Sequence, residues 1–529
     1  MLSWGPGRPA YAKCSRLLRA PNASDNHLLV RPEVIGQPSH VGRYALVSAG
    51  LLLGGEMPEL KSVYHARKRE AIESFLGFAQ GREFPKFPLE VFLEISNLCD
   101  LQCAMCVTFS ALNPERPNNI RRVKRAFTNL DSLERLDEIL KHAVWVHAFG
   151  YGEPTIHTQF KEILDKLRHY EVLVDFFTNG MHLTEELCAT LVRNKVFRIT
   201  ISFSGANKED YEKVYLKGHF ETVIDGISRL AAAKKAAGSI YPRIDINSIA
   251  FNHHVEHLSE FVDLMSRAGA NHINLKPLSL YANIPQLEEL NAVYRPHIEG
   301  RLLDDAQVLA KERGIGLGTA EFRRHAVLSA AEEEDYIKVR KVENWHAAGE
   351  FIAGVPTPSA VDHEVSDLLT KSREGATVRD KPPQDVAPQN IAPLEMRRFD
   401  VERPCLEPFK TMYIHGNGNI RPCCFMENPN AGRILGNAIE DGARAWTTPN
   451  LSAMREGVIT DRYPTNCGAC LIKDSAPKHH NVNTTVAQYS KWFWHEFGVP
   501  FHSTAQQGAR TLTSNREIVD LWRAKKDDR

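Results

Sequence analysis

The sequence contains no long apolar run and carries no net charge. Its most apolar segment, Tyr44–Leu53, is broken by Ser48 and Gly50 and falls short of the ~18 apolar residues that cross a bilayer. Lysine and arginine together number 65, as do aspartate and glutamate, so no overall electrostatic field gathers nucleic acid or an acidic membrane surface. We therefore expect neither a membrane span nor a nucleic-acid partner.

Cysteine is also scarce, and its placement is uneven. Of ten cysteines, three lie between Cys99 and Cys106 and five between Cys405 and Cys470. A secreted disulfide framework spreads its cysteines and follows a signal peptide, whereas here the apolar segment begins more than forty residues in. Thiols grouped in this way indicate metal or cluster ligation in a reducing cytosol, and we expect a cytoplasmic protein.

The rest of the composition is globular, with 43% apolar and 25% charged residues. Short apolar runs alternate with longer segments of helical periodicity, which predicts βα units and a parallel sheet. Six such units favour an α/β fold, a partial or full TIM-like (β/α) barrel whose active site lies at the carboxyl ends of the strands. The predicted strands are Leu89–Ile95, Val144–Phe149, Val172–Phe177, Phe197–Phe203, Arg243–Ile249 and Asn271–Leu275. The predicted helices are Glu59–Ala79, Thr158–His169, Thr184–Arg193, Phe220–Ala237, Val255–Ala268 and residues 286–313.

Composition also divides the chain into segments. Residues 1–56 are rich in Gly, Pro and Arg and show no clean period, so they form either a flexible N-terminal extension or a stretch ahead of a true start at Met57. A Cys-rich module follows a proline-containing linker, and its segment Tyr413–Cys423, centred on Gly416-Asn417-Gly418, predicts a β-hairpin. The predicted segments are the extension (1–56), the barrel with its N-terminal helix (57–318), an insertion or linker (319–400), the Cys-rich module (401–476) and a helical tail (477–529).

The first cysteine group follows the first predicted strand. Cys99, Cys103 and Cys106 stand at a C-x3-C-x2-C spacing, which lets three thiolates wrap a loop around one corner of a [4Fe–4S] cube. The fourth iron then has no protein ligand and can bind a substrate or cofactor, whereas a four-Cys cluster usually only carries electrons. The competing interpretation is a set of buried or zinc-binding cysteines.

The segment Ser96-Asn97-Leu98-Cys99-Asp100-Leu101-Gln102-Cys103-Ala104-Met105-Cys106 resembles the cluster loop of the radical S-adenosylmethionine (radical SAM) enzymes. The resemblance implies that the open iron chelates the amino and carboxylate groups of S-adenosylmethionine. It also implies that an electron from the reduced cluster cleaves the sulfonium to a 5′-deoxyadenosyl radical, which abstracts hydrogen from the substrate. Reduced flavodoxin or ferredoxin is the expected electron donor.

Three later segments resemble the same family in the expected order. Gly150-Tyr151-Gly152-Glu153-Pro154 is similar to the motif that holds the methionine amino group, and Thr178-Asn179-Gly180 is similar to the turn after the third strand. Ile201-Ser202-Phe203-Ser204-Gly205 is similar to the fourth-strand motif, although the usual Asp is Ser204 and the Arg that pairs with the methionine carboxylate aligns with Tyr215, leaving Lys213 or Lys217 to take that charge. The implied cofactor-binding residues are Gly152, Glu153, Pro154, Thr178, Asn179 and Ser202.

The second cysteine group resembles the auxiliary-cluster modules of the SPASM and twitch subfamilies. Its pattern is Cys405-x12-Gly418-x4-Cys423 followed by Cys467-x2-Cys470. The resemblance implies that these four cysteines hold an auxiliary [4Fe–4S] cluster, and because no cysteine follows Cys470, the count fits the one-cluster twitch form. Cys424 is expected to be a spare, and a four-Cys zinc site is the alternative.

The substrate is not fixed by these motifs. A small polyol, sugar or cyclitol fits a single-cluster module, with the auxiliary cluster accepting the electron left after hydrogen abstraction. A peptide-modifying maturase is the alternative, and a non-catalytic zinc or iron–sulfur interaction protein is the competitor from another class. Lys276, at the end of the sixth predicted strand, and His253, in the His253-His254 pair after the fifth, are the candidate catalytic residues.

Overall fold

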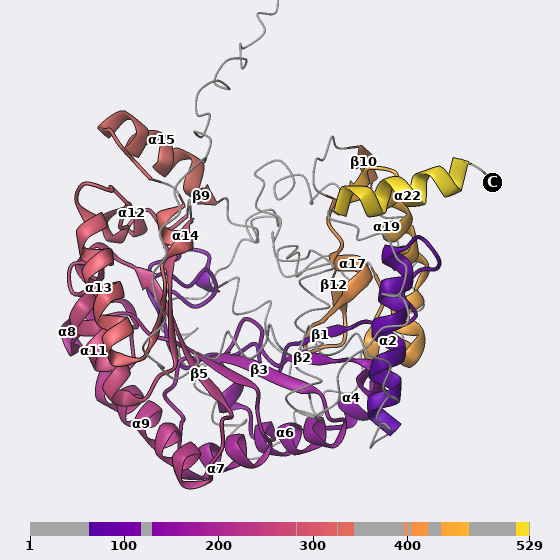
Figure 1. The fold of residues 1–529 in the computed structure, drawn as a ribbon, viewed down its shortest axis with the longest axis horizontal. Helices are drawn as coiled ribbons and strands as arrows, with labels where there is room; N and C mark the ends of the chain where they lie inside the picture. The colour runs from indigo at the N-terminus through magenta and orange to yellow at the C-terminus, as the bar shows by residue number, and fades with distance from the viewer. Residues whose placement is uncertain are drawn as a thin grey trace, which may run out of the picture. The chain divides into compact units, whose positions relative to one another are not determined.

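The computed structural model describes residues 63–117, 128, 130–281, 283–324, 326–342, 396–398, 404–421, 435–464 and 515–527. All of them belong to the unit Leu60–Arg529, and the predicted extension 1–56 lies outside them. Within the described residues, a nine-stranded sheet has the order β12-β11-β1-β2-β3-β4-β5-β6-β8 (Figure 1). Its strands are β1 (Glu90–Leu93), β2 (Trp145–His147), β3 (Leu173–Thr178), β4 (Arg198–Ser202), β5 (Arg243–Ala250), β6 (His272–Pro277), β8 (Gly316–Gly318), β11 (Thr411–Ile414) and β12 (Ile420–Arg421).

The six predicted strands are β1 to β6, and each pairs in parallel with the next. The predicted partial barrel is therefore confirmed. The strand β8, which pairs with β6, was not predicted because Gly-Leu-Gly carries no apolar run or alternation.

Helices alternate with the strands and cover one face of the sheet (Figure 1). Local signals set their ends: the Thr184 side chain accepts from the Leu187 backbone N–H at the start of α7, and Gly269 ends α11 in the left-handed conformation. The single helix predicted over 286–313 is wrong, because Pro296 interrupts it and two helices form. The helices are α2 (Val63–Ala79), α4 (Leu130–Arg135), α5 (Asp137–His142), α6 (Phe160–His169), α7 (Glu185–Arg193), α8 (Lys208–Val214), α9 (Phe220–Ala236), α10 (Asn252–Val255), α11 (Leu258–Ala268), α12 (Leu287–Leu290) and α13 (Glu299–Arg313).

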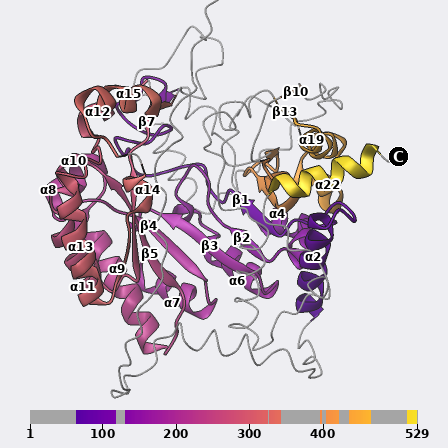
Figure 2. The same ribbon diagram turned by 45° about the horizontal axis from the view of Figure 1, so that its top comes forward.

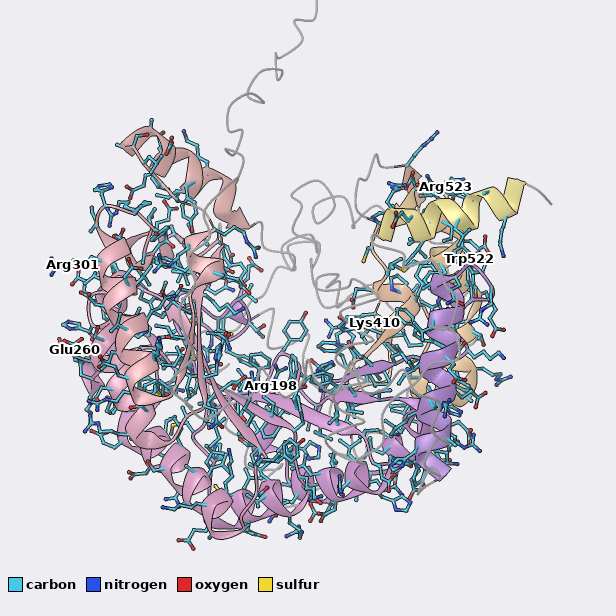
Figure 3. All side chains as sticks on the ribbon, in the orientation of Figure 1. Arg198, Glu260, Arg301, Lys410, Trp522 and Arg523 are labelled. Atoms are coloured by element: carbon cyan, nitrogen blue, oxygen red, sulfur yellow. The ribbon has the colours of Figure 1, made fainter. Side chains whose placement is uncertain are left out.

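The two faces of the sheet differ in chemistry. Alternate strand residues point to opposite faces, and one set is buried in the core beneath the helices. The other set is polar or aromatic and faces the barrel interior; Figure 3 shows Arg198 on this inner side. The core set includes Val91, Leu93, Val146, Val174, Phe176, Ile199, Ile201, Ile244, Ile246, Ile273 and Leu275. The inner set includes Glu90, Phe92, His147, Asp175, Phe177, Arg198, Thr200, Ser202, Asp245, Asn247, Asn274 and Lys276.

A row of buried charges crosses the inner face near the amino ends of the strands. Lys410 Nζ lies 3.0 Å from Glu90 Oε2, His147 Nε2 lies 3.6 Å from the same oxygen, and His147 Nδ1 lies 2.6 Å from Asp175 Oδ1. Asp175 also pairs with Arg198. Burial alone would lower the pKa of His147, but the charge and hydrogen bond of Asp175, together with Glu90, raise it to about 9.

The predicted hairpin exists and is part of the main sheet. The strands β11 and β12 pair antiparallel, and Gly418 in their turn has φ +86°, which favours glycine. However, β11 also pairs in parallel with β1, with Glu90 opposite Thr411 and Phe92 opposite Tyr413. The segment that sequence assigns to a second module therefore extends the sheet of the barrel.

Further helices from the C-terminal part pack on α2. These are α17 (Glu407–Lys410), α19 (Pro449–Ile459) and α22 (Asn515–Asp527), and Figure 2 shows α22 beside α19. The Phe78 ring stacks on Phe409 and on Trp522, with centroids 4.2 Å and 5.7 Å apart. No helix among the described residues is long and apolar enough to cross a membrane.

Candidate radical SAM site

The loop that carries the first cysteine group is held in place by backbone hydrogen bonds. The Leu98 N–H donates to Ser96 Oγ at 3.1 Å, which turns the chain after β1. The Gln102 N–H donates to the Leu216 carbonyl at 3.0 Å, and the Ala104 N–H to the Val214 carbonyl at 2.8 Å. The carboxyl end of α8 and the residues just after it therefore hold the cysteine loop in place.

The three loop cysteines are free thiols, and burial dominates their chemistry. Burial raises the pKa of Cys99 and Cys103 well above the usual thiol value, and nearby acidic groups raise both further. Burial also raises the pKa of Cys106. A bare thiolate is thus disfavoured at all three positions, and a cationic centre ligated by the sulfurs would offset that cost.

Three partly buried thiols on one loop are the donor set of a cluster that keeps one iron open. No three metal-ligating side chains among the described residues converge on one point as ligands of a single ion would. A cube asks for less convergence, because each thiolate holds a different iron. The donor set and its burial therefore fit a cube with one iron left open.

The predicted Gly150–Pro154 loop docks directly on the cysteine loop. The Gly152 N–H donates to the Ser96 carbonyl at 3.1 Å, and the Glu153 N–H to the Leu98 carbonyl at 2.7 Å. A Cβ on Gly152 would lie 2.2 Å from the Leu98 carbonyl oxygen, so only glycine allows this approach. Pro154 begins the short 3₁₀ helix η1 (Pro154–Ile156) that closes the loop.

The Glu153 carboxylate is 3% exposed and joins the Gly150–Pro154 loop to the Thr178–Gly180 turn. Its Oε1 accepts from Thr155 N at 3.0 Å, Thr155 Oγ1 at 2.6 Å and Thr178 Oγ1 at 2.7 Å. Its Oε2 accepts from the Asn179 N–H at 2.6 Å. Burial raises the pKa of Glu153, while these donors oppose that shift. Oε2 keeps capacity for a further donor such as an ammonium.

A second carboxylate, which the sequence did not predict, joins the cysteine loop to the Thr178–Gly180 turn. Asp100, next to Cys99, accepts from Asn179 Nδ2 at 2.8 Å, and its Oδ2 lies 2.6 Å from His182 Nε2. Burial would raise the pKa of Asp100, but hydrogen bonding and the charge of His182, together with Asn179, lower it. The available signal was an acidic residue inside the cysteine motif. Its partners Asn179 and His182 lie 79 and 82 residues further along the chain, so spacing alone could not find them.

Ser202 lies on the inner face at the carboxyl end of β4 and is partly exposed. The register places Asn247 beside it on β5, and Asn274 beside Asn247 on β6. These two asparagines were not predicted, although strand alternation places both on the inner face. Three neighbouring polar side chains can thus hydrogen-bond a ligand above the sheet.

The two candidate catalytic residues lie in different surroundings. Lys276 is on the inner face of β6 and pairs with Glu321 of α14 (Ala320–Arg323), each side chain being about one-third exposed. His253 lies in α10, where its ring stacks on Phe251. Its neighbour His254 is fully buried and bonded to Ser248 Oγ and the Gly205 N–H, with burial lowering its pKa to about 3.

The two departures from the family motif are structural residues. The Ser204 hydroxyl accepts from the Ile249 N–H at 2.8 Å and lies 3.2 Å from Tyr215 Oη. Both side chains are buried, so Tyr215 occupies core space rather than a charged pocket. Lys213 and Lys217 are exposed.

Of the four predicted auxiliary ligands, the structure describes one. Cys405 is a partly buried thiol that packs against the apolar cluster of α2 and α19. Cys423, Cys467 and Cys470, and the spare Cys424, lie outside the described residues. The hairpin that leads to Cys423 is described up to Arg421.

Family comparisons agree with both halves of this arrangement. Residues 93–242 match the Radical SAM superfamily, and residues 405–471 match the SPASM iron–sulfur cluster-binding domain. The chain contains a radical SAM domain. Its radical SAM domain contains the cysteine loop and the Gly150–Pro154, Thr178–Gly180 and Ser202 segments, and its SPASM domain contains all four predicted auxiliary ligands.

The curated relatives cover part of this radical SAM chain. Mycofactocin maturase MftC of Mycolicibacterium smegmatis is 29% identical over 183 residues, which is 35% of this chain and 43% of that protein. PqqA peptide cyclase of Granulibacter bethesdensis is 20% identical over 194 residues, 37% of this chain and 48% of that protein. The chain thus spans less than half the length of these relatives. Their names describe a maturase and a peptide cyclase, which supports the peptide alternative better than the polyol prediction.

Solved structures with a related fold include Streptococcus suis SuiB. The superposition covers 83% of this chain and 85% of the SuiB chain, at 15% sequence identity and a TM-score of 0.44.

Proposed function

We propose that the protein is a radical SAM enzyme that binds S-adenosylmethionine at a [4Fe–4S] cluster on Cys99, Cys103 and Cys106 and modifies a peptide. The observation that carries this proposal is the direct docking of the Gly152-Glu153 backbone on the cysteine loop. When bound, the cluster and S-adenosylmethionine supply a 5′-deoxyadenosyl radical that abstracts hydrogen from the substrate.

The residues of the chain bind and orient the cofactor. Glu153 Oε2 would accept from the methionine ammonium, because Oε1 already accepts three hydrogen bonds from Thr155 and Thr178, whereas Oε2 accepts one, from the Asn179 N–H. Asp100 and Asn179 hold the cysteine loop against the turn after β3. Ser202 and Asn247 present neutral polar groups to the rest of the cofactor from the inner face.

The proposed peptide substrate is supported by the names of the relatives and by side chains at the inner face of the sheet. A maturase and a peptide cyclase are the functions that the names of the relatives give. Lys276 and Glu321 form an ion pair at the carboxyl end of β6, where a βα barrel receives its substrate. An ammonium and a carboxylate side by side suit the charged and amide groups of a peptide. Cys405, Cys423, Cys467 and Cys470 would hold the auxiliary cluster, which would supply an acceptor for the electron left by hydrogen abstraction.

Anaerobic incubation of reconstituted protein with S-adenosylmethionine and dithionite tests the proposal. The reconstituted chain is expected to hold about eight irons, as two cubes, and to form 5′-deoxyadenosine. A library of small precursor peptides is expected to raise that rate and to become modified, and a matched set of polyols and sugars is the second arm. Zinc in place of iron refutes the assignment, and turnover of a polyol alone refutes the peptide substrate.

A further inference from the structure

Glu94, the residue that follows β1, is not part of the cysteine loop, yet its carboxylate joins two distant segments. It is 2% exposed. Its Oε1 accepts from the Tyr151 N–H at 3.3 Å, in the middle of the Gly150–Pro154 loop. Its Oε2 accepts from the Gly416 N–H at 3.1 Å and lies 3.1 Å from His415 Nδ1, both in the β11–β12 turn.

The packing around Glu94 leaves no room for a side chain at Gly150. A Cβ on Gly150 would lie 2.3 Å from Glu94 Cγ and 2.7 Å from Oε1. The glycine therefore lets the Gly150–Pro154 loop, here called the cofactor loop, approach the carboxylate closely. Burial alone would raise the pKa of Glu94, but the His415 hydrogen bond and the charges of His415 and Arg421 lower it, so the group is a carboxylate that accepts from both segments.

A second contact links the same two segments. Arg421 Nη1 donates to Tyr151 Oη at 3.1 Å, and its guanidinium lies 5.3 Å from the centroid of the Tyr151 ring. The Tyr151 and His415 rings stack at a centroid separation of 6.4 Å. Arg421 stands two residues before Cys423. The cofactor loop and the strand that leads to a proposed auxiliary ligand thus share one polar cluster.

We propose that Glu94 is a positioning residue that fixes the S-adenosylmethionine loop against the auxiliary-cluster hairpin, so that occupancy of the first site is transmitted to the second. The inference rests on the proposed function. Cofactor binding orders the Gly152-Glu153 backbone, which continues directly from Tyr151. That ordering passes to the hairpin through the Glu94 carboxylate and the Tyr151–Arg421 hydrogen bond.

Hydrogen–deuterium exchange of the reconstituted holoprotein, with and without saturating S-adenosylmethionine, tests the inference. In the native protein, the cofactor is expected to slow exchange across residues 411–421 about threefold or more. Glu94→Gln should remove most of this effect. A glutamine presents one acceptor and one donor group, so either Tyr151 N–H or Gly416 N–H meets an amide NH₂ and loses its bond.

Two further variants complete the experiment. Tyr151→Phe keeps the backbone bond to Glu94 and removes the acceptor for Arg421; it should weaken the effect on 411–421 even if Glu94→Gln does not fold. Asp245→Asn removes an equally buried inner-face carboxylate whose partner is Arg243, and it should leave the effect intact. Binding measured by calorimetry sets the saturating concentration for each variant.

The outcomes separate this inference from the proposed function. Absence of S-adenosylmethionine binding or of iron overturns the proposed function. Binding and cleavage in the native protein with no change in the hairpin, or an undiminished change in both Glu94→Gln and Tyr151→Phe, overturns the positioning role of Glu94 alone.

Discussion

Replacing Glu153 with glutamine changes hydrogen bonding as well as charge. The carboxylate accepts from two backbone N–H groups, those of Thr155 and Asn179, and from the hydroxyls of Thr155 and Thr178. A glutamine offers one acceptor oxygen and one NH₂ group. The hydroxyls can rotate to accept, but a backbone N–H cannot, so either Thr155 N or Asn179 N must face a donor.

The expected loss has two components. One buried N–H left without an acceptor costs about 1–3 kcal/mol of unfolding free energy. The relief of a buried charge, whose pKa is raised by burial, offsets part of that cost. Loss of the charge-assisted bond to the methionine ammonium weakens binding by a further ~1.5–3 kcal/mol, about ten- to a hundredfold in affinity.

Two measurements separate these components. Anaerobic denaturant titration reports the stability of Glu153→Gln, and calorimetric titration with S-adenosylmethionine reports its affinity at full iron content. We expect both to fall. A variant that is less stable but binds normally would assign Glu153 a purely structural role, and one that keeps both properties would contradict the geometry described above.

Four other changes have defined outcomes. Gly152→Ala should abolish S-adenosylmethionine binding and lower cluster occupancy, because its Cβ would lie 2.2 Å from the Leu98 carbonyl oxygen; normal iron content with normal affinity would contradict this. Ser202→Ala should weaken the affinity only by about 1 kcal/mol, the value of a neutral hydrogen bond, and calorimetry that shows no loss would remove Ser202 from the pocket. Cys467→Ala should lose about four of the eight irons and the native product yet still form 5′-deoxyadenosine; full turnover would exclude an oxidative role for the auxiliary cluster. The pKa of His147 is about 9 against the usual 6.5, so its protonated ring contributes stability that is fully present below pH ~6.5. The free energy of unfolding should fall by roughly 3 kcal/mol as the pH rises through 9. Denaturant titration between pH 6 and 9.5 should show this decline, and His147→Asn should reduce it.

The sequence predicted the barrel strands well because buried parallel strands read as short apolar runs. Each predicted strand contains its observed counterpart or differs from it by one or two residues, as Leu89–Ile95 does from Glu90–Leu93. The cysteine spacing likewise led to one loop, and the Gly150–Pro154 and Thr178–Gly180 segments lie against it. Such features depend on local pattern, which a sequence displays directly.

Features that depend on pairing across the chain were not predictable in this way. The parallel register between Glu90 and Thr411 joins residues more than three hundred positions apart, and no local signal records it. The same holds for Asp100 with His182 and for Glu94 with His415, because no local pattern links either acidic residue to its distant partner. The break within 286–313 was visible as Pro296, but the amphipathic pattern on both sides of it favoured one helix.

The parallel ladder between β1 and β11 has a consequence for attempts to shorten the protein. A chain ended before Cys405 would keep every cysteine of the first loop, yet it would expose the backbone N–H and C=O groups of Glu90–Leu93 along a bare edge. It would also leave Glu90 buried without the Lys410 ammonium 3.0 Å away. An isolated barrel of this sequence would therefore begin with an unpaired edge strand, and among the described residues Glu90 would keep only His147, 3.6 Å away, as a neighbouring cation. The cysteine loop follows directly on that edge strand.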